Sequence, residues 1–287
     1  LPTVTGAWDN GGRYGGVAPM ARWQDAALPV QLSAQGYATG LFGKYLNGYG
    51  SRNRNTFGST PPGWDVFNVY SGRQGSGYYS AVRGLGGRGY STDSLGLATA
   101  DFIASAPADQ PLFAYYSPFA PHKPYDAGPY KGAAGPRLQR LARSSGALFN
   151  PAFDTVRRGQ PAWLQRLKPV RAKNFRRVAR EQTDAMMGVD ANVARIVAAV
   201  SQNRDIDNTL FVFMSDNGYS WGDHRLVAKR SPYVSTNEIP LMVRYPGSSR
   251  VPRPGEDPRL ANNVDVTATI LSVAGAANSS DGLPLNG

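Results

Sequence analysis

The sequence contains no cysteine, which excludes disulfide bonds and thiolate metal sites. It also lacks any apolar run near the roughly 18 residues of a membrane-spanning helix, so we expect no membrane span. No basic segment followed by an apolar stretch opens the chain, so no signal peptide is visible. Histidine is scarce as well, since there are two in 287 residues.

Negative charge is the minority: 20 acidic residues stand against 31 basic ones, which gives a net charge of +11. Guanidinium groups match the oxygens of sulfate, phosphate and carboxylate, so an anionic partner is expected. The basic residues are scattered, however, and only 171–180 is locally dense, where a solvated helix face is the simpler interpretation. No DNA- or RNA-binding signature is found, so nucleic acid is not the expected partner.

Short apolar runs alternate with stretches of helical spacing, and the runs are almost continuously apolar. This combination predicts an α/β fold, with a mixed, mostly parallel sheet sandwiched between helices. Thr92 or Asp93 is expected to cap the helix predicted at 92–106. The predicted strands are Tyr37–Phe42, Pro111–Ser117, Thr209–Ser215 and Pro240–Tyr245, and the predicted helices are Leu28–Gln35, Thr92–Ala106, Asn174–Gln202 and Asn263–Ala274. Residues 47–90 are predicted to be loop, with short strands around Trp64–Tyr70 as an alternative.

Polar side chains follow three of the predicted strands. Lys44 follows the first strand after Gly43, His122 follows Pro111–Ser117, and Asp216 with Asn217 follows Thr209–Ser215. In open α/β sheets, ligands bind beyond the carboxyl ends of the strands. We therefore predict that these side chains, together with Lys229, surround one hollow of the size of an anion.

Asp216 and Asn217 supply a carboxylate and an amide oxygen, which suit a hard cation such as Ca²⁺ or Mg²⁺. Neighbouring side chains converge only where a strand has ended, and Gly218 would permit the turn. A simple Asn-Gly turn without a metal is the alternative interpretation.

His122 lies between two prolines, which are expected to keep its loop extended. It would protonate a leaving group or bind an anion, or it is an ordinary surface histidine. Lys44 would hold an anion as a point charge, or is merely exposed. The polar loop 219–230 reaches over the same edge of the sheet, or is simply solvated, and it carries Asp223, His224, Arg225, Lys229 and Arg230.

Four segments, taken in order, resemble the sulfatase family of the alkaline-phosphatase-like superfamily, in the version of its glucosamine-6-sulfatase-like and arylsulfatase members. They are GYATG…GKYLN at 36–47, SPFAPHKP at 117–124, SDNG at 215–218 with GDH at 222–224 and Lys229, and the stretch 263–275 with Asp281-Gly282.

The resemblance implies a sulfuric ester hydrolase that acts on a sulfated sugar, glycan or aryl sulfate. Asp216 and Asn217 would be calcium ligands, with Mg²⁺ as an alternative, while Lys44 and Lys229 would hold the sulfate. His122 would assist departure of the alcohol. His224 and Arg230 would contact the substrate. The family's nucleophile is a formylglycine made from Cys or Ser in a C/S-x-P-x-R segment, and its members are commonly secreted or periplasmic.

Residues 1–287 contain neither a C/S-x-P-x-R segment nor the paired aspartates of the family's first strand. We therefore expect a single catalytic domain that is truncated at both ends and has negligible turnover by itself. Two alternatives stay open. One is a phosphodiesterase or phosphonate hydrolase of the same superfamily, and the other is a pseudo-sulfatase that binds sulfated glycans. Substrate specificity is expected in the loops 47–90 and 125–172.

Overall fold

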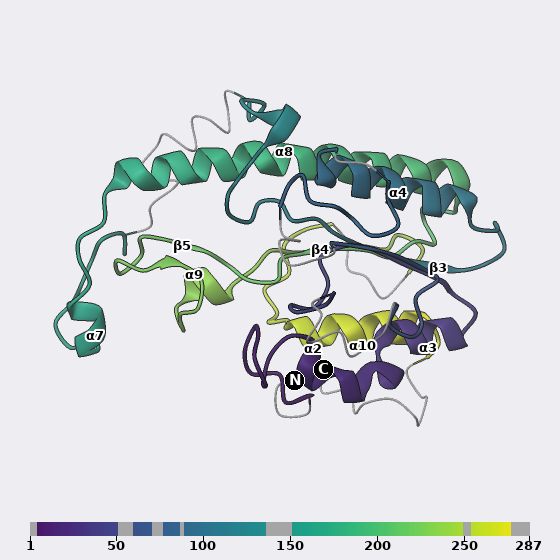
Figure 1. Ribbon diagram of the computed structural model, residues 1–287, viewed down its shortest axis with the longest axis horizontal. Coiled ribbons are helices and arrows are strands. Elements are labelled where there is room, and N and C mark those ends of the chain that lie inside the picture. Colours follow the sequence, from purple (N-terminus) through teal and green to yellow (C-terminus); the bar gives the residue numbers. More distant parts are fainter. Residues whose placement is uncertain are drawn as a thin grey trace. The chain divides into compact units, whose positions relative to one another are not determined.

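The structure is a computed structural model that describes residues 5–50, 60–70, 77–86, 89–135, 151–248 and 254–276 (Figure 1). The chain forms two compact units. Unit 1 comprises 1–119, 189–204 and 254–287, and unit 2 comprises 120–188 and 205–253. Among the described residues, no helix is long and apolar enough to cross a membrane.

Unit 1 is built on a parallel sheet of three strands, β1 (Ala38–Gly43), β2 (Val66–Val69) and β3 (Leu112–Ser117), in the order β2-β1-β3. Helix α4 (Ser91–Ser105) packs on β1 and β3, and α3 (Leu28–Ala34) packs on β1 and against α10 (Asn263–Val273). Figure 1 shows α4 on one face of this sheet and α3 with α10 on the other. Every residue of β1 is buried. The predicted parallel sheet between helical layers is therefore confirmed.

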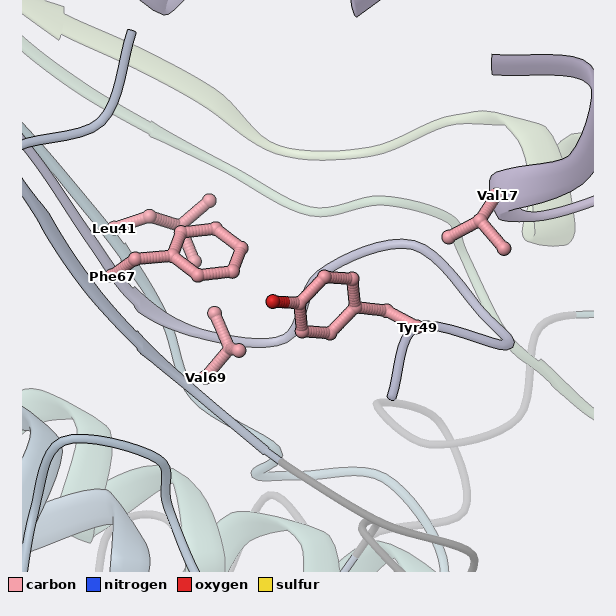
Figure 2. Packing of buried hydrophobic residues seen from close by; sticks show 5 residues of the cluster. All are labelled: Val17, Leu41, Tyr49, Phe67 and Val69. Carbon is pink, nitrogen blue, oxygen red and sulfur yellow. The ribbon is translucent and has the colours of Figure 1, made fainter. Parts of the chain in front are cut away.

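A buried apolar cluster lies beside the end of β1 (Figure 2), and it joins the sheet to helix α2 (Val17–Met20) and to the loop that follows the strand. The ring of Tyr49 meets that of Phe67 edge-on at 5.3 Å, and the ring of Tyr45 lies 5.1 Å from Phe67. Burial raises the pKa of Tyr45 to about 12. The cluster fixes the segment after Lys44 against the sheet, and its members are Val17, Leu41, Tyr49, Phe67 and Val69.

Two helix ends of unit 1 follow the expected chemistry and one does not. Pro29 lies in the first turn of α3, where proline is tolerated, and α10 begins with a capping box between Asn262 and Asp265. The predicted cap of α4 is wrong, because the N-cap is Tyr90 and no side chain caps it. Asp93 instead accepts a hydrogen bond of 2.7 Å from Asn192 Nδ2. A long-range partner thus replaces the local cap.

Unit 2 has less regular structure, and its strands pair in antiparallel fashion. β4 (Phe211–Met214) pairs with β7 (Leu241–Arg244), so this pair differs from the mostly parallel arrangement expected from its apolar runs. The predicted loop 219–230 instead contains a short antiparallel pair, β5 (Ser220–Trp221) with β6 (Val227–Ala228). An apolar run records burial but not strand direction, which explains the difference.

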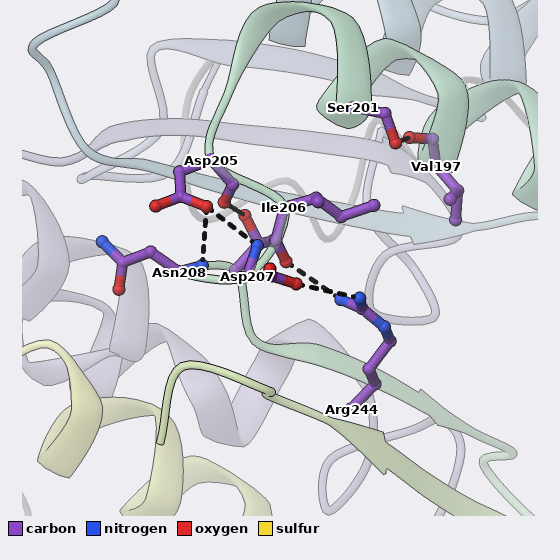
Figure 3. A network of polar contacts seen from close by, with 8 residues as sticks. Val197, Ser201, Asp205, Ile206, Asp207, Asn208 and Arg244 are labelled. Carbon is purple, nitrogen blue, oxygen red and sulfur yellow. Dashed lines mark hydrogen bonds and ion pairs between the residues drawn. The ribbon is translucent and has the colours of Figure 1, made fainter.

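Helix α8 (Ala172–Asn203) contributes its first half to unit 2 and its second half to unit 1. The turn between α8 and β4 is fixed by side-chain bonds (Figure 3). Asp205 Oδ1 accepts from the backbone N–H of Asp207 and Asn208 at 3.0 and 3.3 Å, and Arg244 of β7 donates to Ile206 O at 2.9 Å. The remaining described elements are η1 (Ala21–Ala26), η2 (Gly128–Tyr130), α7 (Ala162–Gln165) and α9 (Val234–Asn237).

Candidate functional site

Lys44 lies at the carboxyl end of the parallel sheet, where the sequence predicts it. Its backbone N–H donates to Ser117 O at 2.7 Å, and the Ser117 hydroxyl donates back to Lys44 O at 3.0 Å. Gly43 has φ 137°, and a Cβ there would lie 1.9 Å from Ser117 O. Only glycine therefore lets the chain pass this close to the end of β3 and present Lys44 at that edge.

The half-buried side chain of Lys44 extends over an aromatic platform. Its Nζ lies 5.9 Å from the ring centroid of Phe119. Phe119 is in turn fixed by Tyr70, whose hydroxyl accepts from Phe119 N at 3.0 Å and whose pKa is raised by burial. An aromatic face attracts an ammonium group, so this contact helps to hold the Lys44 side chain over Phe119.

Asn217 and Lys229, which are 12 residues apart, are brought into direct contact within unit 2. Lys229 Nζ donates to Asn217 Oδ1 at 2.8 Å, and Asn217 Nδ2 donates to Gly218 O at 2.9 Å. A charge-assisted hydrogen bond of this kind fixes the direction of the ammonium group. Asp216, the neighbour of Asn217, is exposed. The structure therefore joins two of the predicted site residues and leaves a carboxylate beside them.

Gly218 is needed for a reason other than the predicted one. Its φ is not in the positive range, so the turn itself does not require glycine. A Cβ at Gly218 would instead lie 2.4 Å from Ser235 O, and Gly218 N donates to Thr236 O at 3.0 Å. The glycine makes room for α9 to pack against the Asp216–Asn217 turn.

The loop around Lys229 concentrates backbone strain. Positive φ values occur at His224 (53°), Arg225 (65°), Ala228 (69°) and Arg230 (77°), all of them residues with a Cβ. Such conformations cost on the order of 1–3 kcal/mol each and cluster at functional sites. The strained positions flank Lys229 and include His224 and Arg230, which are both predicted substrate contacts.

A hydrogen-bonded frame holds this strained loop. Gln160 Nε2 lies 3.1 Å from His224 Nδ1, and the His224 ring lies 4.6 Å from that of Tyr233. Arg225 Nε donates to Asp154 Oδ1 at 3.0 Å, and the same oxygen accepts from Val170 N at 3.1 Å. The segment 152–170, which carries no sequence pattern, is therefore what fixes His224.

His122 lies in a turn, not in the extended loop that its flanking prolines predict: Tyr125 N donates to His122 O at 3.0 Å. The imidazole is exposed, and its Nδ1 lies 2.9 Å from Lys123 O. Three residues further on, the hydroxyl of Tyr125 lies 2.9 Å from that of Tyr219. This bond ties the His122 loop to the segment that follows Asn217.

Sequence reasoning missed the residues that hold the site, namely Gln160, Tyr125 and Tyr219. Burial raises the pKa of Tyr219 above its usual range, and the hydrogen bond with the Tyr125 hydroxyl adds to the effect, so the Tyr219 hydroxyl remains protonated at neutral pH. The position of Tyr219 directly after the Asp-Asn-Gly turn is the one signal that marked it. Ser220, by contrast, is buried and donates to Leu226 O at 3.1 Å, which is a structural role.

The gathering of all five predicted residues around one hollow stays a prediction. Lys44 belongs to unit 1, whereas His122, Asp216, Asn217 and Lys229 belong to unit 2. The specificity prediction for loops 47–90 and 125–172 falls partly on 51–59, 71–76, 87–88 and 136–150, which lie outside the described residues. The same holds for the Asp281-Gly282 turn.

The donors fit Ca²⁺ or Mg²⁺ in type but not in number. Asp216 and Asn217 offer hard oxygens, yet Asn217 Oδ1 already accepts from Lys229. No group of three or more His, Asp or Glu side chains that could hold a metal occurs in the part of the chain that the structure describes. Because Ca²⁺ takes about six to eight oxygens, these two residues form at most part of its coordination shell.

The fold, with its parallel sheet and with Lys44 at the carboxyl edge of that sheet, is that of an α/β protein of the alkaline-phosphatase-like class. A solved structure of BT4656 in complex with its substrate D-glucosamine-2-N,6-O-disulfate superposes with a TM-score of 0.61 at 22% identity, over 89% of this chain and 62% of that one. The chain belongs to the sulfatase family, whose profile matches residues 13–276.

Two relatives show how the family relates to this chain. N-acetylglucosamine-6-sulfatase of Capra hircus is 30% identical over 275 residues, which cover 88% of this chain and 47% of the relative. Arylsulfatase of Volvox carteri is 28% identical in an alignment 314 residues long, which covers 96% of this chain and 47% of the relative. The chain thus spans about half the length of these relatives.

Proposed function

We propose that the chain provides the sulfate-binding part of a sulfuric ester hydrolase whose substrate is a sulfated sugar. The observation that carries the proposal is the contact of 2.8 Å between Lys229 Nζ and Asn217 Oδ1, in a loop with four strained residues. The relatives named N-acetylglucosamine-6-sulfatase favour a sugar sulfate over an aryl sulfate as the substrate.

Each side chain has a task that follows from its chemistry. Lys229, oriented by Asn217, and Lys44 bind the negatively charged oxygens of the ester. Hydrolysis breaks the bond between sulfur and the bridging oxygen and yields an alcohol and sulfate. His122 in its protonated form donates a proton to the departing oxygen. His224, which Gln160 and Tyr233 hold in place, contacts the sugar with Arg230. Cations aimed at the sulfate stabilise the charge that shifts as the bond breaks.

Asp216 would hold Ca²⁺ or Mg²⁺ as one ligand among several, and such an ion would polarise the sulfate oxygens. We also propose that the protein acts outside the cytoplasm. The name of one relative, "Extracellular sulfatase SULF-1 homolog" of Drosophila melanogaster, favours this location.

Binding of N-acetylglucosamine 6-sulfate to the purified chain tests the proposal, with calorimetry as the readout. The sulfated sugar is expected to bind at least about tenfold more tightly than N-acetylglucosamine, since charge-assisted bonds distinguish the two. Lys229→Met is expected to remove most of that preference. Lys131→Met, a change at an exposed lysine, is the matched control.

Equal binding of the sulfated and unsulfated sugars, or an unchanged preference in Lys229→Met, would contradict the proposal. The release of sulfate by the protein tests the chemical step. Release from a phosphonate monoester but not from the sugar sulfate would favour the phosphonate hydrolase instead. Binding of the sulfated sugar without release would favour a glycan-binding pseudo-sulfatase.

A further inference from the structure

The most uneven charge distribution of the chain lies apart from the site residues. Residues 155–180 hold nine of the 31 basic residues and none of the 20 acidic ones. All nine are exposed. They are Arg157, Arg158, Arg166, Lys168, Arg171, Lys173, Arg176, Arg177 and Arg180.

Four of these residues form a stripe on α8, which we call the basic stripe: Lys173, Arg176, Arg177 and Arg180. Their spacing of i, i+3, i+4 and i+7 places them within an arc of about 100° on an α-helix. At about 1.5 Å per residue, the stripe is about 10 Å long. It therefore presents a row of cations to solvent, not a single point charge.

The stripe works against the stability of its own helix. Lys173 with Arg177 and Arg176 with Arg180 are like charges four residues apart, and such pairs are destabilising. Cations in the first turns also oppose the helix dipole, and α8 has no acidic residue in its first turn. Among the described residues, Arg177 alone of the four pairs with a carboxylate, that of Glu181 at 2.8 Å. An external polyanion would relieve both kinds of repulsion.

The opposite face of the helix turns inward, toward the segment that carries the candidate site. Phe175 and Ala179 are buried, and Gln182 Oε1 accepts from Trp221 Nε1 at 2.9 Å. Trp221 belongs to β5, which lies between Asn217 and Lys229. The stripe thus faces away from β5. It is placed to bind a part of a ligand other than the part held at Asn217 and Lys229.

We propose that the basic stripe is a docking surface for a sulfated polysaccharide, which binds here through sulfates remote from the one that is cleaved. The proposal rests on the proposed function, since it takes the substrate to be part of a sulfated chain. Three of the four cations are arginines, whose forked donors bind tetrahedral oxyanions bidentately. A row about 10 Å long spans more than one anionic group of an extended polymer.

Features of the stripe favour a glycan over two other polyanionic surfaces. Exposed aromatic rings stack on unpaired bases in proteins that bind single-stranded nucleic acid, but the four residues of the stripe include no aromatic ring, and Phe175 on the opposite face of the helix is buried. A membrane-surface helix needs an apolar face for insertion, and the apolar face of this part of α8 is packed inside unit 2.

The test compares the affinity of a fluorescent heparin oligosaccharide for the purified chain and for matched variants, at several salt concentrations. Arg176→Gln with Arg180→Gln is expected to weaken binding about tenfold near 0.15 M salt, the effect of about two exposed ion pairs. The dependence on salt is also expected to become shallower. Arg13→Gln with Lys131→Gln removes the same charge at exposed residues elsewhere and should change affinity by less than about twofold. Glu181→Gln, which releases Arg177, is expected to strengthen binding.

Further arms separate this proposal from the proposed function. Lys229→Met should weaken heparin binding less than the stripe variant does, while the stripe variant should keep its affinity for N-acetylglucosamine 6-sulfate. Equal heparin binding by the wild-type chain and the stripe variant would refute the docking surface. Tighter binding to duplex DNA or to anionic vesicles than to heparin would refute the assignment of a glycan. Far-UV circular dichroism of each variant, compared with the wild-type chain, verifies that the variants are folded.

Discussion

Unit 1 holds Lys44 by packing, whereas unit 2 holds Lys229 by side-chain hydrogen bonds. Lys44 follows a fully buried strand, and its backbone is pressed against Ser117 where Gly43 leaves no room for a Cβ. Lys229 lies in a loop of positive φ values that bonds to Asn217, Gln160 and Asp154 keep in shape. An added atom should therefore disrupt the packing around Lys44, whereas removal of one side chain near Lys229 should remove only the hydrogen bonds of that side chain.

The largest effect should come from adding an atom to the packed region. Gly43→Ala places a Cβ 1.9 Å from Ser117 O at φ 137°. We expect the free energy of unfolding, measured in urea, to fall by about 3 kcal/mol or more. Gly36→Ala is the control, since φ there is +84° and nothing lies within 4 Å. Its cost should be about 1 kcal/mol. Similar losses at both positions would show that packing at Ser117 is not what matters.

The next effect tests the bonded frame. Asp154→Ala leaves the mostly buried Arg225 guanidinium and the Val170 N–H without this acceptor. We expect a loss of about 2 kcal/mol, because two partly buried donors lose their acceptor. Glu181→Ala removes an exposed ion pair with Arg177 and should cost no more than about 0.5 kcal/mol. If the two variants are equally stable, the frame does not hold the loop.

The sequence predicted the packed region better than the bonded one, for a physical reason. Continuous apolar runs and Gly43 mark β1 and its end locally. The bonds Tyr125–Tyr219 and Gln160–His224 join residues 94 and 64 positions apart, so no local pattern announces them. Gly218 was found but explained wrongly, since its neighbour is the backbone of α9. The antiparallel direction of β7 was likewise not encoded in its apolar run.

A smaller effect concerns the aromatic cluster that packs behind Lys44. Burial raises the pKa of Tyr45 from 10.0 to about 12. The folded state therefore keeps its proton to higher pH than the unfolded state, so this stability is fully present below pH 10 and is lost between pH 10 and 12. Subtracting the free energy of unfolding of Tyr45→Phe from that of the wild type isolates the effect.

That difference should be flat below pH 10 and then fall by at most about 1.4 kcal/mol per pH unit. Tyr70, whose pKa is also raised by burial, remains in both proteins and cancels, whereas the repulsion between the Tyr45 and Tyr49 phenolates is part of the measured difference. A difference that stays flat up to pH 12 would mean that Tyr45 ionises as freely in the folded chain as in the unfolded one.

The smallest effect separates loop position from stability in unit 2. Tyr219→Phe removes one hydroxyl of the 2.9 Å pair and leaves that of Tyr125 without this partner. A loss of about 1 kcal/mol is expected, and Tyr125→Phe should cost about the same. The double variant should lose less than the sum, because neither hydroxyl is then left without its partner. If the pair positions His122, each single variant also lowers the rate of sulfate release by the protein. The double variant then regains part of its stability but not its rate of sulfate release. Full recovery of both would assign the pair to stability alone.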